Sequence, residues 1–182
     1  MKKLTFLTGM LLMLMVSSCR DIVNTVLDAL PPFDVPYSTN ITVPFVGVSS
    51  TSYTRTPEIP MNIDLDAKIK ENNPNYSINN LKSVKLNTLT FTWISAVADT
   101  KLNVIKNARL YIKTPNMDEK LIATAYDNTN PDTITFTVLD EELLNYFKTT
   151  QNSLIMEVIA SSPNADQISM KINSGFKIKV QL

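Results

Sequence analysis

The chain has 182 residues, with 17 basic and 17 acidic side chains, so its formal net charge is zero. This balance excludes the basic field that attracts nucleic acid, and a content of 44% hydrophobic and 19% charged residues is typical of a globular domain. The chain has no histidine and a single cysteine, which excludes histidine-based catalysis, an internal disulfide and a thiolate zinc site. We therefore expect no cofactor.

Residues 1–18 have the layout of a secretory signal peptide. Lys2 and Lys3 give a positively charged start, and an apolar run from Leu4 to Val16 follows. The run is shorter than the roughly 20 residues that a membrane-spanning helix needs. A charged start, a short apolar run and small residues at its end together predict export and removal of this segment.

Ser17 and Ser18 stand directly before Cys19, the only cysteine of the chain. The segment resembles the signal of bacterial lipoproteins, which implies cleavage between Ser18 and Cys19 and attachment of lipid to Cys19. Two or more acyl chains hold a protein stably on a membrane, whereas one chain binds only marginally. The alternatives are ordinary cleavage that leaves a free thiol, and retention of the apolar run as an anchor helix.

The residue after Cys19 is Arg20 and not the aspartate of an inner-membrane retention signal. We therefore expect a lipid anchor in the outer membrane, with the orientation toward the periplasm or the medium left open. Residues 19–36 form the predicted tether. Within the segment from Asp21 to Leu30, the apolar residues lie at helical spacing. Three prolines follow it and stiffen the chain.

Residues 37–182 are predicted to form one β domain, because apolar and polar residues alternate along most of it. Pro44 and Pro60 lie at or near two of the early strands and indicate edge or irregular strands. The alternation of apolar and polar residues changes phase at Asn87 and Thr88, which indicates a β-bulge. A loop is expected at 66–80, with one helical turn at 67–71. The expected strands lie at 41–48, 59–65, 84–93, 108–112, 121–126, 134–138, 154–158 and 168–182.

One short helix is predicted at 141–148. Asp140 is expected to cap it, and the acidic Glu141 and Glu142 suit the positive N-terminal end of a helix. No helices separate the other strands, which excludes parallel βαβ units. The predicted fold is an all-β antiparallel sandwich of about eight strands, of immunoglobulin-like or Greek-key type, with a closed barrel as the alternative.

The last strand has the clearest pattern. Every apolar side chain from Ile168 to Leu182 has an even number, and polar side chains occupy the odd positions. Strict alternation indicates one face on a core and one face in water. An apolar-to-charged substitution at Phe176 is therefore expected to be severe.

The sequence offers few candidates for a binding or catalytic site. Asn62, Asp64 and Asp66 would place three oxygen ligands on one face of a strand, which makes them a candidate calcium site. The glycine and the distal glutamate of an EF-hand loop are missing. No other metal site is predicted, and no catalytic constellation is present.

The chain resembles small uncharacterised β-sandwich lipoproteins of Bacteroidetes. The likeness lies in its signal, its proline tether and the strand pair that runs from Leu81-Lys82-Ser83-Val84-Lys85-Leu86 through Asn107-Ala108-Arg109-Leu110-Tyr111-Ile112. Because no catalytic constellation is present, we expect a lipid-anchored, non-enzymatic binding or structural module of the cell envelope that meets an envelope protein or a glycan, and no nucleic acid. A small carboxylate-dependent hydrolase and an adhesin or fimbrial assembly subunit are the alternatives.

Overall fold

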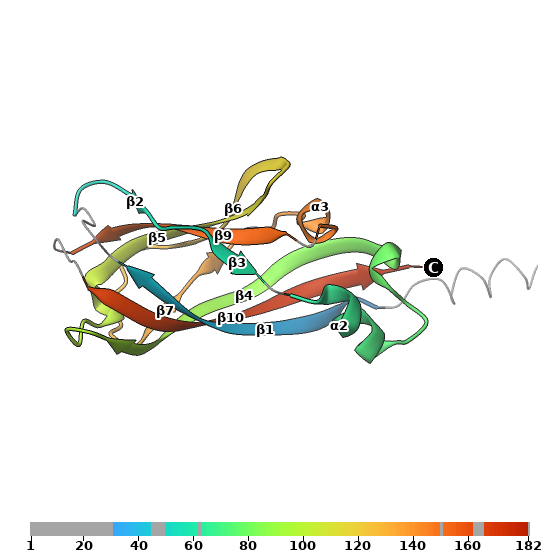
Figure 1. The fold of residues 1–182 in the computed structure, drawn as a ribbon, viewed down its shortest axis with the longest axis horizontal. Helices are drawn as coiled ribbons and strands as arrows, with labels where there is room; N and C mark the ends of the chain where they lie inside the picture. Colours follow the sequence, from blue (N-terminus) through green and yellow to red (C-terminus); the bar gives the residue numbers. More distant parts are fainter. Residues whose placement is uncertain (1–30, 45–49, 62, 150, 162–165, 182) are drawn as a thin grey trace, which may run out of the picture.

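The protein is described here by a computed structural model that covers residues 31–44, 50–61, 63–149, 151–161 and 166–181. These residues form two antiparallel β-sheets that lie face to face (Figure 1). The predicted signal, Ser18 and Cys19 lie outside the described residues. Within the described part, no helix has the length and apolar character needed to cross a membrane.

The strands of the described part alternate with four short helical segments. The helices are α2 (Leu65–Asn72), α3 (Leu144–Phe147) and the 3-10 turns η1 (Ile78–Asn80) and η2 (Leu102–Val104). The strands are β1 (Phe33–Pro44), β2 (Thr54–Arg55), β3 (Ile59–Met61), β4 (Leu81–Ala96), β5 (Ile105–Thr114), β6 (Met117–Ala125), β7 (Thr133–Thr135), β8 (Thr137–Val138), β9 (Asn152–Ala160) and β10 (Gln167–Val180).

The strand order identifies the kind of sandwich. One sheet has the order β1-β10-β4-β7, and the other has β2-β9-β5-β6-β8 with β3 also paired to β9. The first strand therefore pairs with the last, the second with the next to last, and so inward to the β5–β6 hairpin. This nested pairing is that of a jelly roll, which is built of two Greek keys. The predicted antiparallel sandwich is confirmed, with a more specific Greek-key topology.

The even-numbered face of β10 carries the core, as predicted. Its apolar side chains from Ile168 to Val180 are all at most 2% exposed. The register of β10 with β1 is unbroken, and its irregularity against β4 lies in the partner strand: Gly175 pairs with Thr88, and Phe176 pairs with Leu86. Asn87, which this pairing skips, forms the β-bulge that was predicted from the change of phase in the apolar alternation. A side chain at Gly175 would meet Thr88 Oγ1 at 2.8 Å, so a glycine suits this position.

Phe136 marks the place where the chain passes from one sheet to the other. Thr133–Thr135 pairs with β4, and Thr137–Val138 pairs with β6. Phe136 itself is buried, and its ring lies 4.8 Å from that of Phe91 in a tilted arrangement. The sequence predicted a single strand here, since alternation continues through the crossing and does not reveal a change of partner.

The observed strands differ from the predicted ranges by a few residues at most ends, and the largest differences fall in three places. β1 begins at Phe33, so the last residues of the predicted tether belong to the sheet, where Val35 pairs with Phe176 and is buried. β3 ends at Met61, and α2 occupies most of the region predicted as the end of a strand and a loop. α3 lies inside the predicted range but begins at Leu144.

Asp140 does not cap α3 as expected. No side chain caps that helix from the N-cap position, and Asp140 forms an ion pair of 2.6 Å with Lys85. Glu142 accepts hydrogen bonds from the backbone N–H groups of Val84 and Leu144. The acidic cluster therefore joins the α3 segment to β4, which is a tertiary role that local spacing does not disclose.

Candidate functional site

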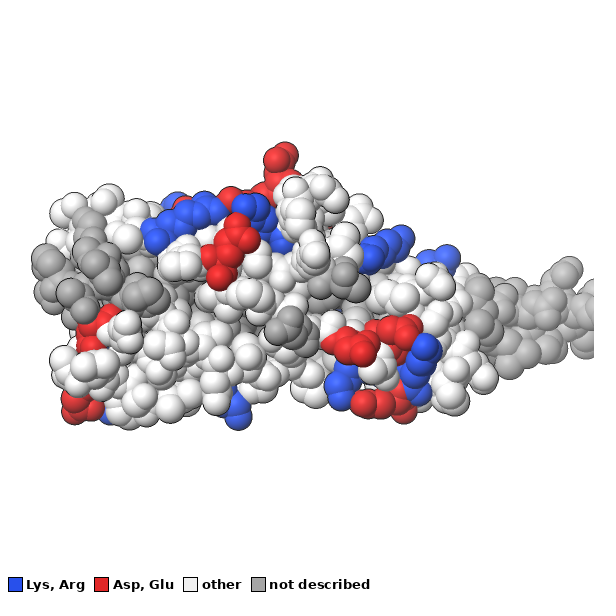
Figure 2. Space-filling model, viewed as in Figure 1, with Lys and Arg blue, Asp and Glu red and all other residues white. Residues whose placement is uncertain are grey.

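The outer face of the six-stranded sheet carries many charged side chains. Figure 2 shows charged side chains gathered over this sheet and around α2, with smaller groups elsewhere on the visible face. Along β5 the outward positions are half-buried and include Arg109, Tyr111 and Lys113. Their neighbours on β9 are Glu157, Ile155 and Ser153 respectively. Polar side chains on this face therefore lie within reach of one another across strands.

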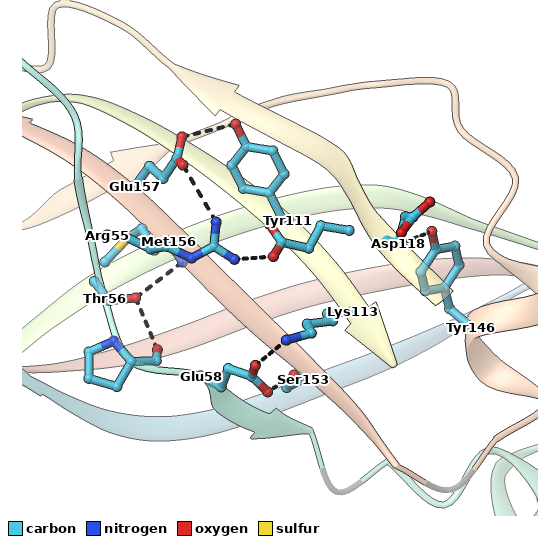
Figure 3. A network of polar contacts seen from close by, with 12 residues as sticks. Arg55, Thr56, Glu58, Tyr111, Lys113, Asp118, Tyr146, Ser153, Met156 and Glu157 are labelled. Atoms are coloured by element: carbon cyan, nitrogen blue, oxygen red, sulfur yellow. Dashed lines mark hydrogen bonds and ion pairs between the residues drawn. The ribbon is translucent and has the colours of Figure 1, made fainter. Parts of the chain in front are cut away.

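Arg55 joins three strands of this face (Figure 3). Its guanidinium donates to Glu119 of β6 and lies 3.7 Å from Glu157 of β9. The hydrogen bond to Glu119 raises the pKa of Arg55. Tyr111 donates from its hydroxyl to Glu157 at 2.9 Å, and burial together with this hydrogen bond raises the pKa of Tyr111. The network holds β2, β6 and β9 together on the solvent side.

A second polar cluster lies farther along the same face (Figure 3). Lys113 Nζ donates to Glu58 Oε1 at 2.6 Å, and Ser153 Oγ donates to Glu58 Oε2 at 3.0 Å. These bonds, with Lys113 as the larger cause, lower the pKa of Glu58. Both carboxylate oxygens of Glu58 are therefore engaged, whereas the ammonium of Lys113 keeps donors that Glu58 does not use.

Lys113 also stands at the start of the tightest turn in this region. β5 ends at Thr114 and β6 begins at Met117, so Pro115 and Asn116 alone make the hairpin turn. Proline suits the second position of such a turn because its φ angle is already set. The hairpin projects from the sheet (Figure 1).

Asn152 brings the start of β9 to the same place. Its Nδ2 donates to the carbonyl oxygen of Tyr146 at 3.3 Å, and the hydroxyl of Tyr146 donates to the carbonyl oxygen of Asp118 at 2.7 Å. Through Tyr146, α3 is thereby tied both to β9 and to β6. Because a carbonyl oxygen only accepts, the amide nitrogen of Asn152 must face Tyr146, which fixes the position of its oxygen.

These segments enclose a cavity of about 470 Å³, which we call the hairpin cavity. This volume falls within the range of roughly 300–1,000 Å³ that is usual for small-molecule sites. Three stretches of chain contribute to it, from the β2–β3 region, the β5–β6 turn and the start of β9. Its lining residues are Glu58, Pro60, Met61, Lys113, Thr114, Pro115, Gln151, Asn152 and Ser153.

Two buried oxygen atoms in the lining have no hydrogen-bond partner among the described residues. They are Thr114 Oγ1 and Asn152 Oδ1, in side chains that are 2% and 8% exposed. A buried donor or acceptor that is left unpaired costs roughly 1–3 kcal/mol. Native proteins leave few such groups, and each one calls for a physical reason. Both side chains stand at buried, core-facing positions of their strands, beneath the lining of the hairpin cavity.

The charges around the hairpin cavity cancel. Among the described residues of its lining, Glu58 and Lys113 are the ones with ionised side chains, and they pair with each other. The remaining lining is apolar or carries neutral polar groups. The cavity therefore has the properties of a binding site for an uncharged, partly polar ligand.

Two further hollows lie nearby. One of about 740 Å³ continues from Thr114 and Pro115 over the other side of the hairpin to Tyr146. Another of about 450 Å³ lies between α2 and the segment after α3. Thr114 lines the hollow of about 740 Å³ as well, whereas Asn152 lines the hairpin cavity and neither of these two. Because three stretches of chain meet at the hairpin cavity, we take it as the candidate site.

The residues predicted as a calcium site have other roles. Asp64 accepts from the backbone N–H of Ala67 at 2.9 Å and caps α2. Asp66 accepts from Lys70 and from the backbone N–H of Ile78, which together lower its pKa. Since both precede or begin a helix, they do not share a strand face as expected. Asn62 lies outside the described residues, and the described residues contain no group of three acidic or other ligating side chains suited to a metal.

Cys19 and Ser18, the predicted lipidation and cleavage residues, also lie outside the described residues. Sequence reasoning missed Thr114 and Asn152. The turn signal at Pro115-Asn116 did place Thr114 beside a hairpin, but nothing in the pattern indicates that this threonine is buried or that residue 152 lies next to it.

A hydrolase of the predicted kind would need a carboxylic acid with a raised pKa. Among the described residues, the carboxyl groups with a shifted pKa are Glu58, Asp66, Glu142 and Asp166, and each shift is downward. In Glu142 burial opposes the shift, but hydrogen bonds from Ser83, Val84 and neighbouring groups outweigh it. These carboxylates are therefore ionised near neutral pH.

Comparison with known proteins gives no family. No protein-family model and no curated protein matches the chain. Among solved structures, the acid-stable capsid of Helicobacter pylori bacteriophage KHP30 matches with a TM-score of 0.33 and 9% identity, over 84% of this chain and 98% of that one. The empty capsid of Triatoma virus matches with a TM-score of 0.33 and 9% identity, over 81% and 89% of the two chains. The jelly-roll topology described above rests on the strand pairing of this chain itself.

Proposed function

We propose that this protein is a lipid-anchored module of the bacterial outer membrane that binds a ligand through the outer face of its six-stranded sheet. The anchor at Cys19 and the destination are inferred from the sequence. The proposed partner is an envelope protein or a glycan, in keeping with the resemblance to Bacteroidetes lipoproteins. The observation that supports binding is the hairpin cavity, which lies beside the Glu58, Lys113 and Ser153 cluster of this face and has a volume usual for a small-molecule site.

The anchor is tested by substituting Cys19. We expect Cys19→Ala to abolish labelling with palmitate and to slow processing of the precursor, because no other thiol is present to receive lipid. Ser17→Ala keeps a small residue before the cleavage site and serves as the matched control with normal labelling. Unchanged labelling of Cys19→Ala would contradict the lipoprotein assignment.

The binding face is tested by photocrosslinking in intact cells. A benzoylphenylalanine placed at Asn116 lies on the exposed hairpin turn, and one at the exposed Lys171 of β10 lies on the other sheet. We expect adducts from position 116 and few from position 171, identified by mass spectrometry. Equal yields from the two positions, or no adduct from position 116, would contradict the assignment of the face. Protease shaving of the same cells reports the side of the membrane.

A further inference from the structure

We infer that two copies of this chain pair through β1, strand against strand, in an antiparallel arrangement centred on Asn40. β1 has 12 residues and runs along the edge of the four-stranded sheet, where β10 is its one partner strand in the described part (Figure 1). The other strands at the edges of the described sheets have two or three residues each. Short edge strands resist the addition of a further strand, so β1 is the edge that is long enough to accept one. This inference goes beyond the proposed function, which concerns the outer face of the other sheet.

The middle of β1 suits strand pairing. Between Pro36 and Pro44 the sequence reads Tyr-Ser-Thr-Asn-Ile-Thr-Val, with no charge, no glycine and no proline. β-Branched and aromatic residues favour strands, and charged residues are a usual means of keeping a sheet edge unpaired. Tyr37 and Ile41 pack against the core and are only half-buried, whereas the apolar side chains of β10 beside them are at most 2% exposed. A second strand at this edge covers what Tyr37 and Ile41 leave exposed.

The two prolines indicate which backbone groups of β1 face the open edge. In an antiparallel pair, residues that exchange hydrogen bonds with the partner strand alternate with residues whose N–H and C=O groups point away from it. Proline has no N–H, so in an edge strand it occupies a position of the second kind. Pro36 and Pro44 both have even numbers, and the register with β10 is unbroken between them. The backbone groups of Ser38, Asn40 and Thr42 therefore point toward the open edge.

The spacing of the prolines selects one register. Both lie four residues from Asn40, so a pair centred there sets Pro36 opposite Pro44 of the second copy, at both ends of the ladder. Asn40 then faces Asn40, and Ser38 faces Thr42. These three residues of each copy exchange backbone hydrogen bonds, and no proline interrupts them. A shift of the register by two positions in either direction sets a proline opposite Ser38 or Thr42, which costs hydrogen bonds of the ladder.

The resulting pair is closed and leaves the faces of both sandwiches open. Its two-fold axis is perpendicular to the sheet, and the same surface is used by both copies. Two four-stranded sheets join into one, and both six-stranded sheets lie on the same side of the pair. The ladder is short, so its affinity in dilute solution is low. Anchoring of both copies in one membrane, as proposed above, raises their effective concentration, and the pair is expected there.

The test uses cysteine substitutions in β1, in intact cells. The lipid proposed at Cys19 consumes the only native thiol, and the wild-type chain controls for any crosslink through that residue. Residues that face each other in a hydrogen-bonded antiparallel pair have Cα atoms about 5.5 Å apart, within the range that a disulfide spans. We expect Asn40→Cys to form a covalent dimer on mild oxidation, and a reductant to reverse it.

Ser38→Cys and Thr42→Cys are the matched controls, because both side chains are exposed on the same face of β1 as Asn40. In the inferred register, position 38 lies roughly 13 Å along the strand from position 38 of the second copy, beyond the reach of a disulfide. Each control alone should therefore stay monomeric. Cells that make both variants should yield a dimer with one chain of each, since 38 faces 42. This mixed dimer tests the register without Asn40→Cys, should that variant fold poorly.

Three outcomes would overturn the inference. The first is no dimer from Asn40→Cys and none from the mixed variants. The second is a dimer of Ser38→Cys alone with the yield of Asn40→Cys. The third is a disulfide that joins Asn40→Cys to a different protein, identified by mass spectrometry, because the edge would then receive a foreign strand. Palmitate labelling of Cys19 and the photoadducts at position 116 are measured independently, so a failure here is distinguishable from a failure of the proposed function.

Discussion

Asp166 illustrates how a single carboxylate can hold a loop of this protein. It is 6% exposed and accepts hydrogen bonds from the backbone N–H groups of Ala98 and Gln167, the latter at 2.7 Å. The hydrogen bond from Thr100, followed by those from the backbone, lowers the pKa of Asp166 below its ordinary value of 3.8. In the same loop Asp99 has a φ of 56°, a left-handed conformation that non-glycine residues rarely adopt. The carboxylate therefore stabilises a strained turn.

This arrangement predicts a pH-dependent effect of Asp166→Asn. The pKa is lowered in the folded state, so the charge stabilises the fold fully above the ordinary pKa and loses that effect as the pH falls through the lowered value. We expect Asp166→Asn to have a lower melting temperature than the wild type near pH 7. The difference in melting temperature should become smaller below about pH 4. Thermal melts across this range measure it.

The control for that series is Asp118→Asn, which changes an exposed carboxyl group on β6. It should leave the melting temperature near that of the wild type throughout. If Asp166→Asn lowers the melting temperature by the same amount in acid and at neutral pH, the charge of Asp166 is not what stabilises the loop.

At the scale of elements, β10 is the strand on which the sandwich depends. It pairs with β1 on one side and with β4 on the other, and its apolar face fills the core. Phe176 also meets Phe147 of α3 edge to face, with ring centroids 4.9 Å apart. A change on this face therefore affects both sheets and the helix that covers them.

We expect Phe176→Ala to lower the free energy of unfolding by roughly 3–5 kcal/mol, the usual cost of emptying a buried aromatic site. The neighbouring Lys177 points to the exposed face of the same strand, and Lys177→Ala should stay within about 0.5 kcal/mol of the wild type. Urea denaturation compares the two. Equal effects at 176 and 177 would mean that the faces of β10 are assigned wrongly, and Phe176→Asp should be still more severe because it buries a charge.

Edge strands bear on the alternative function of an adhesin or assembly subunit. In the described sheets β1 and β3 lie at or near an edge, and they contain Pro36, Pro44 and Pro60. Proline removes a backbone donor, and edge prolines hinder the addition of a foreign strand. The sequence had already marked Pro44 and Pro60 as edge signals, and the structure places β1 at the edge of its sheet.

For the molecule as a whole, period-two alternation was enough to predict the class of fold. It also predicted which side chains of β10 are buried, because the apolar face of a half-buried strand must lie on the core. It could not predict which strands pair, since nested contacts between the first and last strands depend on the entire chain. For the same reason α2 was underestimated: its apolar residues, such as Leu65 and Ile69, continue an alternating pattern before helical spacing becomes visible.

The candidate site was beyond the reach of sequence reasoning for a related physical reason. A threonine before a proline turn and an asparagine at a strand start are ordinary surface residues in a sequence. Only the packing of three distant segments buries Thr114 and Asn152 and leaves their oxygen atoms without partners. The feature that identifies the site is thus a property of the fold and not of a motif.

The most direct test of the central claim combines location and face in intact cells. The yield of photoadducts from benzoylphenylalanine at Asn116 is compared with the yield from the same group at Lys171. The account predicts adducts at position 116 and only background at position 171. Equal yields from the two positions would contradict binding through the outer face of the six-stranded sheet.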